Sequence, residues 1–248
     1  MRLSIAWIIA SKELSIFRKK KSIFASVVVF PVFAGIGLPL LVHFILAKSA
    51  PVTPDTLSGL LVVINAFSFF FLLGAATLPT AIATYSIVGE KQEQSLEPLL
   101  ATPATDAEIL LGKSIGALFP PLASIWIGAV IFMGLTDYYL FGLLGRLYYP
   151  NPAIAVIMLV LVPLATIAAV EVSVIISARV NDVRTAQQLG SLIVIPFALV
   201  YVMGEINAFP LTAPYLLALS AAILVVDLVL FRLAVATFNR EEILTTWK

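Results

Sequence analysis

Residues 153–177 read AIAVIMLVLVPLATIAAVEVSVIIS, and Glu171 is the single charged side chain in this stretch. A helix needs about 20 predominantly apolar residues to cross the hydrocarbon core of a bilayer. The length and composition of the stretch therefore predict a membrane-spanning helix.

Five further apolar runs flank this one, so the sequence predicts six spans in a single transmembrane domain covering residues 1–248. The runs cover residues 23–47, 57–82, 114–136, 153–177, 189–204 and 213–231. The fifth run is the shortest, and an alternative is that it enters the membrane and returns through residues 204–210. The predicted fold class is an all-α polytopic membrane protein.

The overall composition supports a membrane protein. Of the 248 residues, 61% are hydrophobic and 12% are charged, with a mean hydropathy of +1.07. A soluble domain carries about a quarter charged residues. The chain has no cysteine, which excludes disulfides, thiolate metal sites and thiol catalysis, and its one histidine, His43, leaves no histidine cluster for a metal.

The distribution of basic residues predicts the orientation, because Lys and Arg accumulate in cytoplasmic loops. An even number of spans places both termini on one side of the membrane, together with the loops 89–113 and 178–188. That side carries Arg2, Lys12, Arg18, Lys19, Lys20, Lys21, Lys91, Lys113, Arg179, Arg184, Arg232, Arg240 and Lys248. The other side carries Lys48 and Arg146. Both termini are therefore predicted to be cytoplasmic, in a cell-membrane protein.

The first 22 residues differ from the spans. Apolar residues recur at helical spacing, with polar side chains off the stripe, and the basic run RKKK follows at 18–21. The stripe consists of Leu3, Ala6, Trp7, Ala10, Leu14 and Phe17. Such a helix is expected to lie along the cytoplasmic leaflet, in contact with membrane lipid. The simpler interpretation is that the basic residues only hold the N-terminus inside.

The string AEILLGKS, residues 107–114, differs from the phosphate-binding pattern G-x-x-x-x-G-K-[ST] in its first glycine alone. Thr105 and Glu108, however, form a capping-box pattern, T-x-x-E, which predicts that a helix starts before this string. Its N–H groups would then be bonded within the helix and unavailable to phosphate. We predict that the chain binds no ATP and no other cofactor of its own.

The loop that precedes this helix carries acids around a short apolar group. Pro98 and Pro103 bracket Leu99, Leu100 and Ala101, which predicts a brief helix, a break and then the capped helix. Apolar residues flanked by acids on a loop favour docking of another protein. The alternative is a solvated loop that only connects two spans.

These residues resemble the signature of type-2 ATP-binding-cassette (ABC) permeases. The matching positions are Glu90, Lys91, Ser95, Leu96, Glu97, Leu99, Leu100, Ala101, Thr102, Pro103, Leu111, Gly112 and Lys113. The string AQQLGSLIVIP at residues 186–196 and the six spans are similar to the family too, whereas Gln94 departs from the glycine that many members have there.

The resemblance implies a non-catalytic half-transporter, usually of an exporter. Residues 1–22 would be the family's elbow helix with its basic cluster, and 89–113 its cytoplasmic coupling loop. Two permease chains, identical or different, would assemble with two separate ABC ATPase subunits that bind ATP. The implied ATPase contacts are Glu90, Lys91, Glu97, Leu99, Leu100, Thr102, Pro103 and Lys113. No nucleic-acid partner is expected.

Two acids inside the spans support a different hypothesis. Glu171 lies in the fourth run and Asp227 in the sixth, and intramembrane acids usually face a partner or water. A secondary transporter or channel would use Glu171 as an ion or proton site. A structural role is the other possibility, with Asp227 paired to Arg232. No arrangement of residues indicates a membrane enzyme.

Overall fold

The computed structural model describes residues 2–48, 53–93, 102–205 and 211–237, and every regular element in them is helical. The elements are α1 (Leu3–Lys19), α2 (Lys21–Lys48), α3 (Pro54–Thr84), η1 (Tyr85–Gly89), α4 (Glu90–Gln92), α6 (Asp106–Leu144), α7 (Pro152–Val156), η2 (Ile157–Leu161), α8 (Val162–Arg179), α9 (Val183–Ser191), α10 (Val194–Glu205) and α11 (Ala213–Thr237). Six helical segments in these residues are long and apolar enough to cross a membrane, as predicted.

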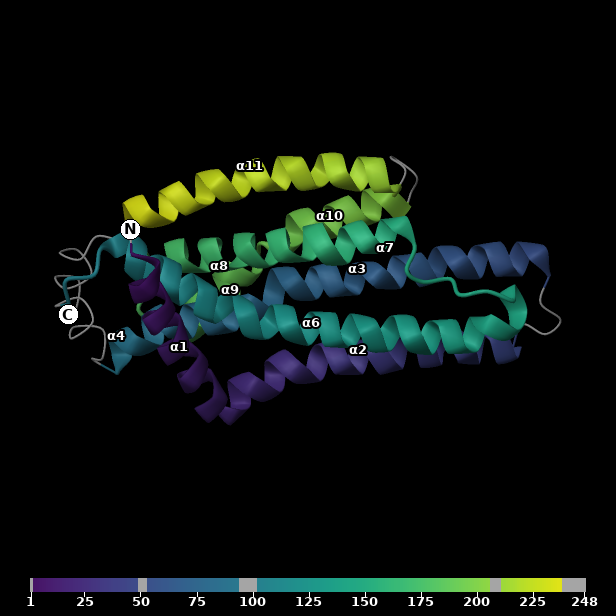
Figure 1. The fold of residues 1–248 in the computed structure, drawn as a ribbon, viewed down its shortest axis with the longest axis horizontal. Helices are drawn as coiled ribbons and strands as arrows, with labels where there is room; N and C mark the ends of the chain where they lie inside the picture. Colours follow the sequence, from purple (N-terminus) through teal and green to yellow (C-terminus); the bar gives the residue numbers. More distant parts are fainter. Residues whose placement is uncertain (1, 49–52, 94–101, 206–210, 238–248) are drawn as a thin grey trace.

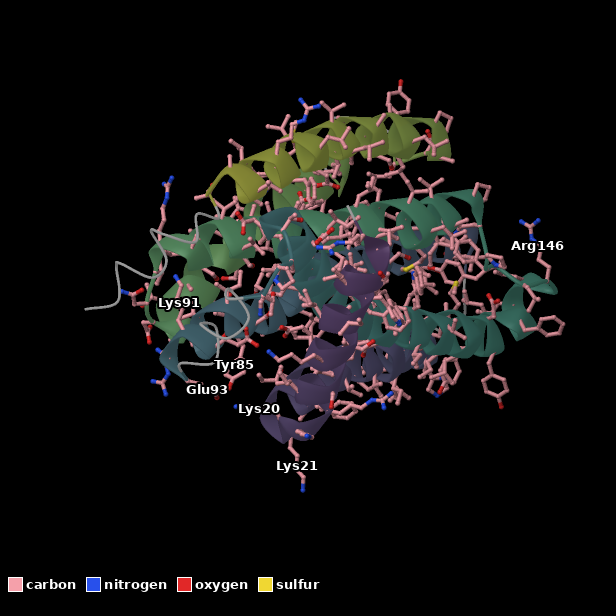
Figure 2. The ribbon with its side chains drawn as sticks, turned by 60° about the vertical axis from the view of Figure 1, so that its left-hand side comes forward. Lys20, Lys21, Tyr85, Lys91, Glu93 and Arg146 are labelled. Atoms are coloured by element: carbon pink, nitrogen blue, oxygen red, sulfur yellow. The ribbon has the colours of Figure 1, made fainter. Side chains whose placement is uncertain are left out.

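The six segments run side by side in an elongated bundle, with α2 along one edge and α11 along the other (Figure 1). Helix α1 crosses one end of the bundle and packs on α6. The end of α11 and the short helix α4 lie at this same end, which we call the α1 end. Arg146 marks the opposite end of the molecule (Figure 2).

Several helices extend beyond the predicted spans. Helix α6 has 39 residues and spans about 58 Å at 1.5 Å per residue, well beyond the hydrocarbon core of about 30 Å. It starts at Asp106 because Thr105 and Glu108 form the predicted capping box. Within the predicted coupling loop 89–113, the last eight residues belong to α6, as the capping box predicted, and residues 89–92 continue from α3 through η1 and α4.

The fifth span is also longer than the sequence indicated. Helices α9 and α10 together give a candidate span from Val183 to Gly204, and the Asp182 side chain caps its start by accepting a hydrogen bond from the Thr185 N–H. The polar first turns of α9 concealed this start in the sequence. Most of the alternative re-entrant segment, residues 206–210, lies outside the described residues.

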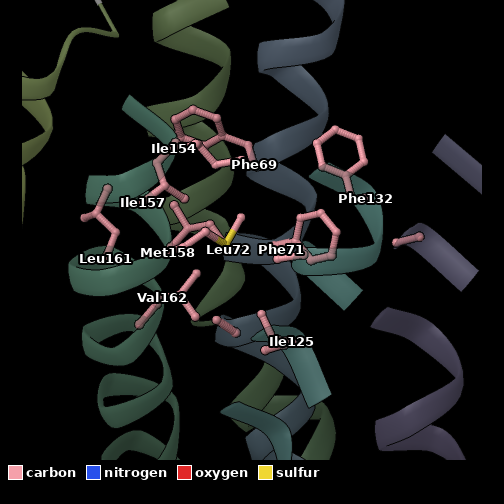
Figure 3. Close-up of a cluster of buried hydrophobic side chains, with 14 of the residues drawn as sticks. Phe69, Phe71, Leu72, Ile125, Phe132, Ile154, Ile157, Met158, Leu161 and Val162 are labelled. Atoms are coloured by element: carbon pink, nitrogen blue, oxygen red, sulfur yellow. The ribbon is translucent and has the colours of Figure 1, made fainter. Parts of the chain in front are cut away.

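The centre of the bundle is packed by apolar side chains from α3, α6 and the segment from α7 to α8 (Figure 3). Phe71 of α3 and Phe132 of α6 are fully buried, with ring centroids 5.5 Å apart. Since lipid is as apolar as these side chains, close packing rather than exclusion from water holds them together.

Glycines allow the backbones of α2 and α6 to touch. A Cβ atom added to Gly35 would lie 2.4 Å from the carbonyl oxygen of Gly128, and one on Gly128 would lie 2.3 Å from that of Pro31. On the same helix α6, Gly112 and Gly116 contact α1 in the same way. No larger residue fits these four positions without separating the helices.

Helix α1 packs on the bundle with a face that differs from the predicted apolar stripe. The buried residues are Ala6, Ile9, Ala10, Glu13 and Phe17. Trp7 and Leu3 of the predicted stripe are exposed, at 61% and 70%, whereas Ala6, Ala10 and Phe17 of the stripe are buried. Helix α1 has apolar residues on two faces, and the polar Glu13, which lies off the stripe, is buried in an ion pair.

Candidate functional site

The residues implied as ATPase contacts fall into two groups in the structure. Glu97, Leu99 and Leu100 lie outside the described residues. Glu90, Lys91, Thr102, Pro103 and Lys113 are described, and they gather at the α1 end of the bundle. Of these five, Thr102 and Pro103 are exposed, whereas the other three are buried within the chain.

Lys113 is at the centre of a buried group of charges. Its ammonium nitrogen, in a side chain that is 1% exposed, lies 2.8 Å from Glu13 Oε1 on α1 and 2.6 Å from Glu90 Oε2 on α4. It also donates a hydrogen bond of 2.6 Å to the carbonyl oxygen of Ser86 in η1. Helix α1 and the consecutive elements η1 and α4, which are far from α1 in the sequence, therefore meet at one lysine of α6.

Lys12 completes the group by binding the other oxygen of Glu90, Oε1, at 2.7 Å. We call Lys12, Glu13, Glu90 and Lys113 the ionic cluster. Its two ammonium and two carboxylate groups balance, which matters because a buried charge is costly unless it is paired and hydrogen-bonded. The cluster joins α1, α4 and α6 at the α1 end of the bundle.

Lys91 connects the same region to α8. Its ammonium group donates hydrogen bonds to the carbonyl oxygens of Ser177 and Ala178, at 2.8 and 3.1 Å. These carbonyls belong to the last turn of α8, where a cation satisfies unpaired acceptors and the helix dipole. Gln92 adds a hydrogen bond of 3.0 Å to the carbonyl oxygen of Asn181, between α8 and α9. Lys91 and Gln92, which are neighbours in α4, thus bind the connection between α8 and α9, that is, between the fourth and fifth spans.

Pro103, which follows the segment 94–101 in the sequence, is joined to the start of α1. Arg2 donates a hydrogen bond of 2.9 Å to the carbonyl oxygen of Pro103, and its backbone N–H donates one of 2.6 Å to Glu108 Oε1. Glu108 is also the capping-box residue of α6. The exposed Thr102 and Pro103 therefore sit on a support built from α1 and α6.

An exposed group of three side chains lies at the junction of α1 and α2 (Figure 2). Tyr85 hydrogen-bonds to both Lys20 and Glu93, and Lys20 lies 3.0 Å from Glu93. The bond from Tyr85 and then the one from Lys20 hold the pKa of Glu93 below its usual value. Glu93 is the last described residue before the segment 94–101, so this group connects that segment to the end of α1.

The AEILLGKS string cannot hold a phosphate in this arrangement. Residues 107–114 are inside α6, as predicted. The Glu108 N–H donates to Thr105 Oγ1, and the N–H groups from Ile109 onward are hydrogen-bonded along the helix. Lys113 is buried against two carboxylates, which would repel a phosphate.

The two intramembrane acids face each other between α8 and α11. Glu171 is 5% exposed and Asp227 is 4% exposed. Glu171 Oε2 and both Asp227 oxygens have no hydrogen-bond partner among the described residues. Asp227 forms no ion pair with Arg232 within this part of the chain, contrary to the pairing considered from sequence. Glu171 also lines a cavity of about 270 Å³ between α6, α8 and α11, together with Ser114 and Phe231.

Sequence reasoning missed Glu13, Lys12 and Arg2 as members of this site. A signal was present for Glu13, because it lies at spacings of three and four residues from Ala10, Ile9 and Phe17, on one helical face. An acid on an otherwise apolar face predicts a buried partner. Its partner, Lys113, lies a hundred residues away and cannot be identified from spacing.

The fold and site together define a multi-pass membrane protein. It has the ionic cluster at one end and no catalytic arrangement among its described residues. A model of the ABC-2 family transporter proteins matches residues 7–218. The chain belongs to this family and is the non-catalytic membrane subunit of an ABC-2 transporter, whose family implies ATPase partner subunits. A search among curated proteins found no match.

Proposed function

We propose that the chain couples ATP hydrolysis by two separate ATPase subunits to the export of an apolar or amphipathic substrate. A second permease chain, identical or related, completes the transporter. The observation that carries this proposal is the ionic cluster, because it joins α4, which precedes the segment 94–101, to α1 and α6. A force on that segment is transmitted to several membrane helices at once.

The ATPase contact is proposed at Glu97, Leu99, Leu100, Thr102 and Pro103. Thr102 and Pro103 have exposed positions that suit such a contact. Glu90, Lys91 and Lys113 have another role in the same site, since their side chains are buried against α1 and α8. They hold the contact surface in place and pass its movement to the spans.

The orientation follows from the same site. We place the α1 end in the cytoplasm, where the ATPase subunits and most basic residues would be. Helix α1 would then lie at the inner membrane surface as an elbow helix, with its exposed Leu3, Trp7 and Ile8 in contact with lipid.

Export is supported by the position of the Glu171 cavity. The cavity is lined by α6 residues between 111 and 118, within about three turns of the α1 end of that helix. A substrate would enter such a cavity from the cytoplasmic side and leave on the other. Membership of the ABC-2 family argues against the alternative of a self-contained secondary transporter, in which Glu171 would be an ion or proton site. We therefore assign Glu171 to the transport pathway of the ATP-driven transporter.

Substitutions in the segment test the coupling. We expect Glu97→Arg to uncouple ATP hydrolysis from transport or to weaken assembly with the ATPase subunit. Leu99→Ala and Leu100→Ala remove apolar anchors, for which a loss of about 2 kcal/mol or more in binding is typical. Glu93→Ala is the matched control, since rim charges contribute less. Assembly is measured by co-purification, and coupling by ATP turnover in reconstituted vesicles.

Two results would contradict the proposal. One is intact assembly and transport in all three segment variants. The other is ATP turnover by the chain alone that Lys113→Ala abolishes, because the chain is expected to hydrolyse no ATP without its partner.

A further inference from the structure

Two adjoining cavities lie where α1, α2 and α6 meet. The first has a volume of about 400 Å³ and is lined mainly by apolar side chains. These include Leu14 and Phe17 of α1, Phe24 and Val28 of α2, and Phe119 and Ile127 of α6. Phe119 is 59% exposed, so the cavity is bordered by an aromatic ring that faces outward.

The second cavity, of about 440 Å³, is bordered by positively charged side chains. Ser11, Ser15, Arg18 and Lys19 line it, all from α1. It shares Leu14 and Arg18 with the first cavity, so the two are continuous at these side chains. An apolar space thus opens directly beside a cationic one.

The two cations of this site, Arg18 and Lys19, have no anionic partner among the residues that the structure describes. Neither Arg18 nor Lys19 forms an ion pair or a side-chain hydrogen bond with any residue that the structure describes. Their neighbours behave differently, since Lys12 binds Glu90 and Lys20 binds Glu93. Arg18 and Lys19 are therefore free to bind an anion from outside the chain.

We propose that this pair of cavities binds one anionic phospholipid. An acyl chain occupies the apolar cavity between α1, α2 and α6, and the phosphate lies against Arg18 and Lys19. Basic pockets beside membrane helices recognise lipid headgroups in this way. The site goes beyond the proposed transport function and does not depend on it.

The chemistry of the site distinguishes this occupant from two others. A free phosphate ion would leave the apolar cavity of about 400 Å³ unfilled. A second copy of the chain is a separate outcome of the test, because it would have to bring both an apolar side chain and an acid to this surface. A phospholipid supplies both the apolar chain and the negative charge.

The test is lipid binding by the purified full-length chain in mixed phosphatidylglycerol and phosphatidylcholine nanodiscs, read by native mass spectrometry of retained lipid. We expect the wild type to retain phosphatidylglycerol preferentially. The double variant Arg18→Gln/Lys19→Gln should lose about tenfold or more of this preference, since each cation near an anionic lipid contributes about fivefold. Lys21→Gln is the matched control, because Lys21 is exposed and lines neither cavity (Figure 2).

A second variant tests the apolar cavity. Ala123→Phe, which fills that cavity, should reduce retention of both lipids, whereas Val130→Phe on an exposed part of α6 should not. The proposal is overturned if the double variant keeps the preference, if both lipids bind equally to the wild type, or if inorganic phosphate alone displaces the lipid. It is also overturned if two permease chains can be cross-linked through a cysteine introduced by Phe119→Cys and no lipid is retained.

Discussion

Lys113 shows how one residue can be recognised in a sequence and still be misinterpreted. Its place in the L-x-G-K string identified the family, and the resemblance implied a contact with the ATPase. In the structure its ammonium group is buried between Glu13 and Glu90. The sequence indicated that the position matters, but burial depends on α1 crossing α6, which no local pattern encodes.

Replacing Lys113 should therefore destabilise the chain itself. We expect Lys113→Met to lower the free energy of unfolding by about 3–5 kcal/mol, because Glu13 loses its ion-pair partner and stays buried. Lys12→Met should cost much less, since the Lys12 side chain is 45% exposed and its pair is accessible to solvent. Thermal unfolding of the two variants in the same detergent compares them. Equal losses would show that the burial of Lys113 is unimportant.

Glu171 is the second residue whose role changed. The sequence left open a pairing of the intramembrane acids with arginine, but Glu171 and Asp227 face each other without a donor. Glu171→Gln removes one of two repelling groups and supplies an amide that can donate a hydrogen bond to Asp227. We expect the melting temperature of the transporter complex to stay the same or rise, and substrate-stimulated ATP turnover to change. Asp227→Asn should have the same effect on stability.

A clear fall in melting temperature in both variants would show that the two carboxyl groups do stabilise the fold through charge. Unchanged turnover in both would remove Glu171 from the transport pathway.

At the scale of elements, α6 organises the molecule through its glycines. Gly112 and Gly116 are four residues apart, the spacing of the G-x-x-x-G pattern that brings membrane helices together. The pattern is visible in the sequence and indicates a close helix contact. The sequence does not reveal the partner, which is α1, because α2, α3 and α8 also pack against α6.

A larger residue at Gly116 should push α1 away from α6. An added Cβ there would lie 2.5 Å from the Cβ of Glu13, so Gly116→Leu displaces the ion pair between Glu13 and Lys113 as well. Overpacking of this kind typically costs about 1–3 kcal/mol. Gly134→Leu on the same helix is the matched control, since no atom lies within 4 Å of its added Cβ. Unfolding of both variants is compared, and equal stability would contradict the close contact of α1 with α6.

For the whole molecule, hydropathy alone predicted the fold class and the number of spans, because a bilayer imposes a minimum length on every crossing helix. Helix ends and contacts were less predictable. The 39-residue α6 exceeds that minimum, and the capping box at Thr105 fixes its start. The ionic cluster depends on contacts between residues 23, 78 and 100 positions apart, so composition and spacing could not reveal it.

The orientation of the whole bundle is a prediction from basic residues, and the lack of native cysteines makes it directly testable. Lys21 and Arg146 are both exposed and lie at opposite ends of the molecule (Figure 2). With the α1 end in the cytoplasm, a membrane-impermeant maleimide added to intact cells should label Arg146→Cys and leave Lys21→Cys unlabelled. After permeabilisation both should react, which controls for accessibility. Labelling of Lys21→Cys alone in intact cells would reverse the proposed orientation, and with it the assignment of the ATPase contact to the segment 94–101.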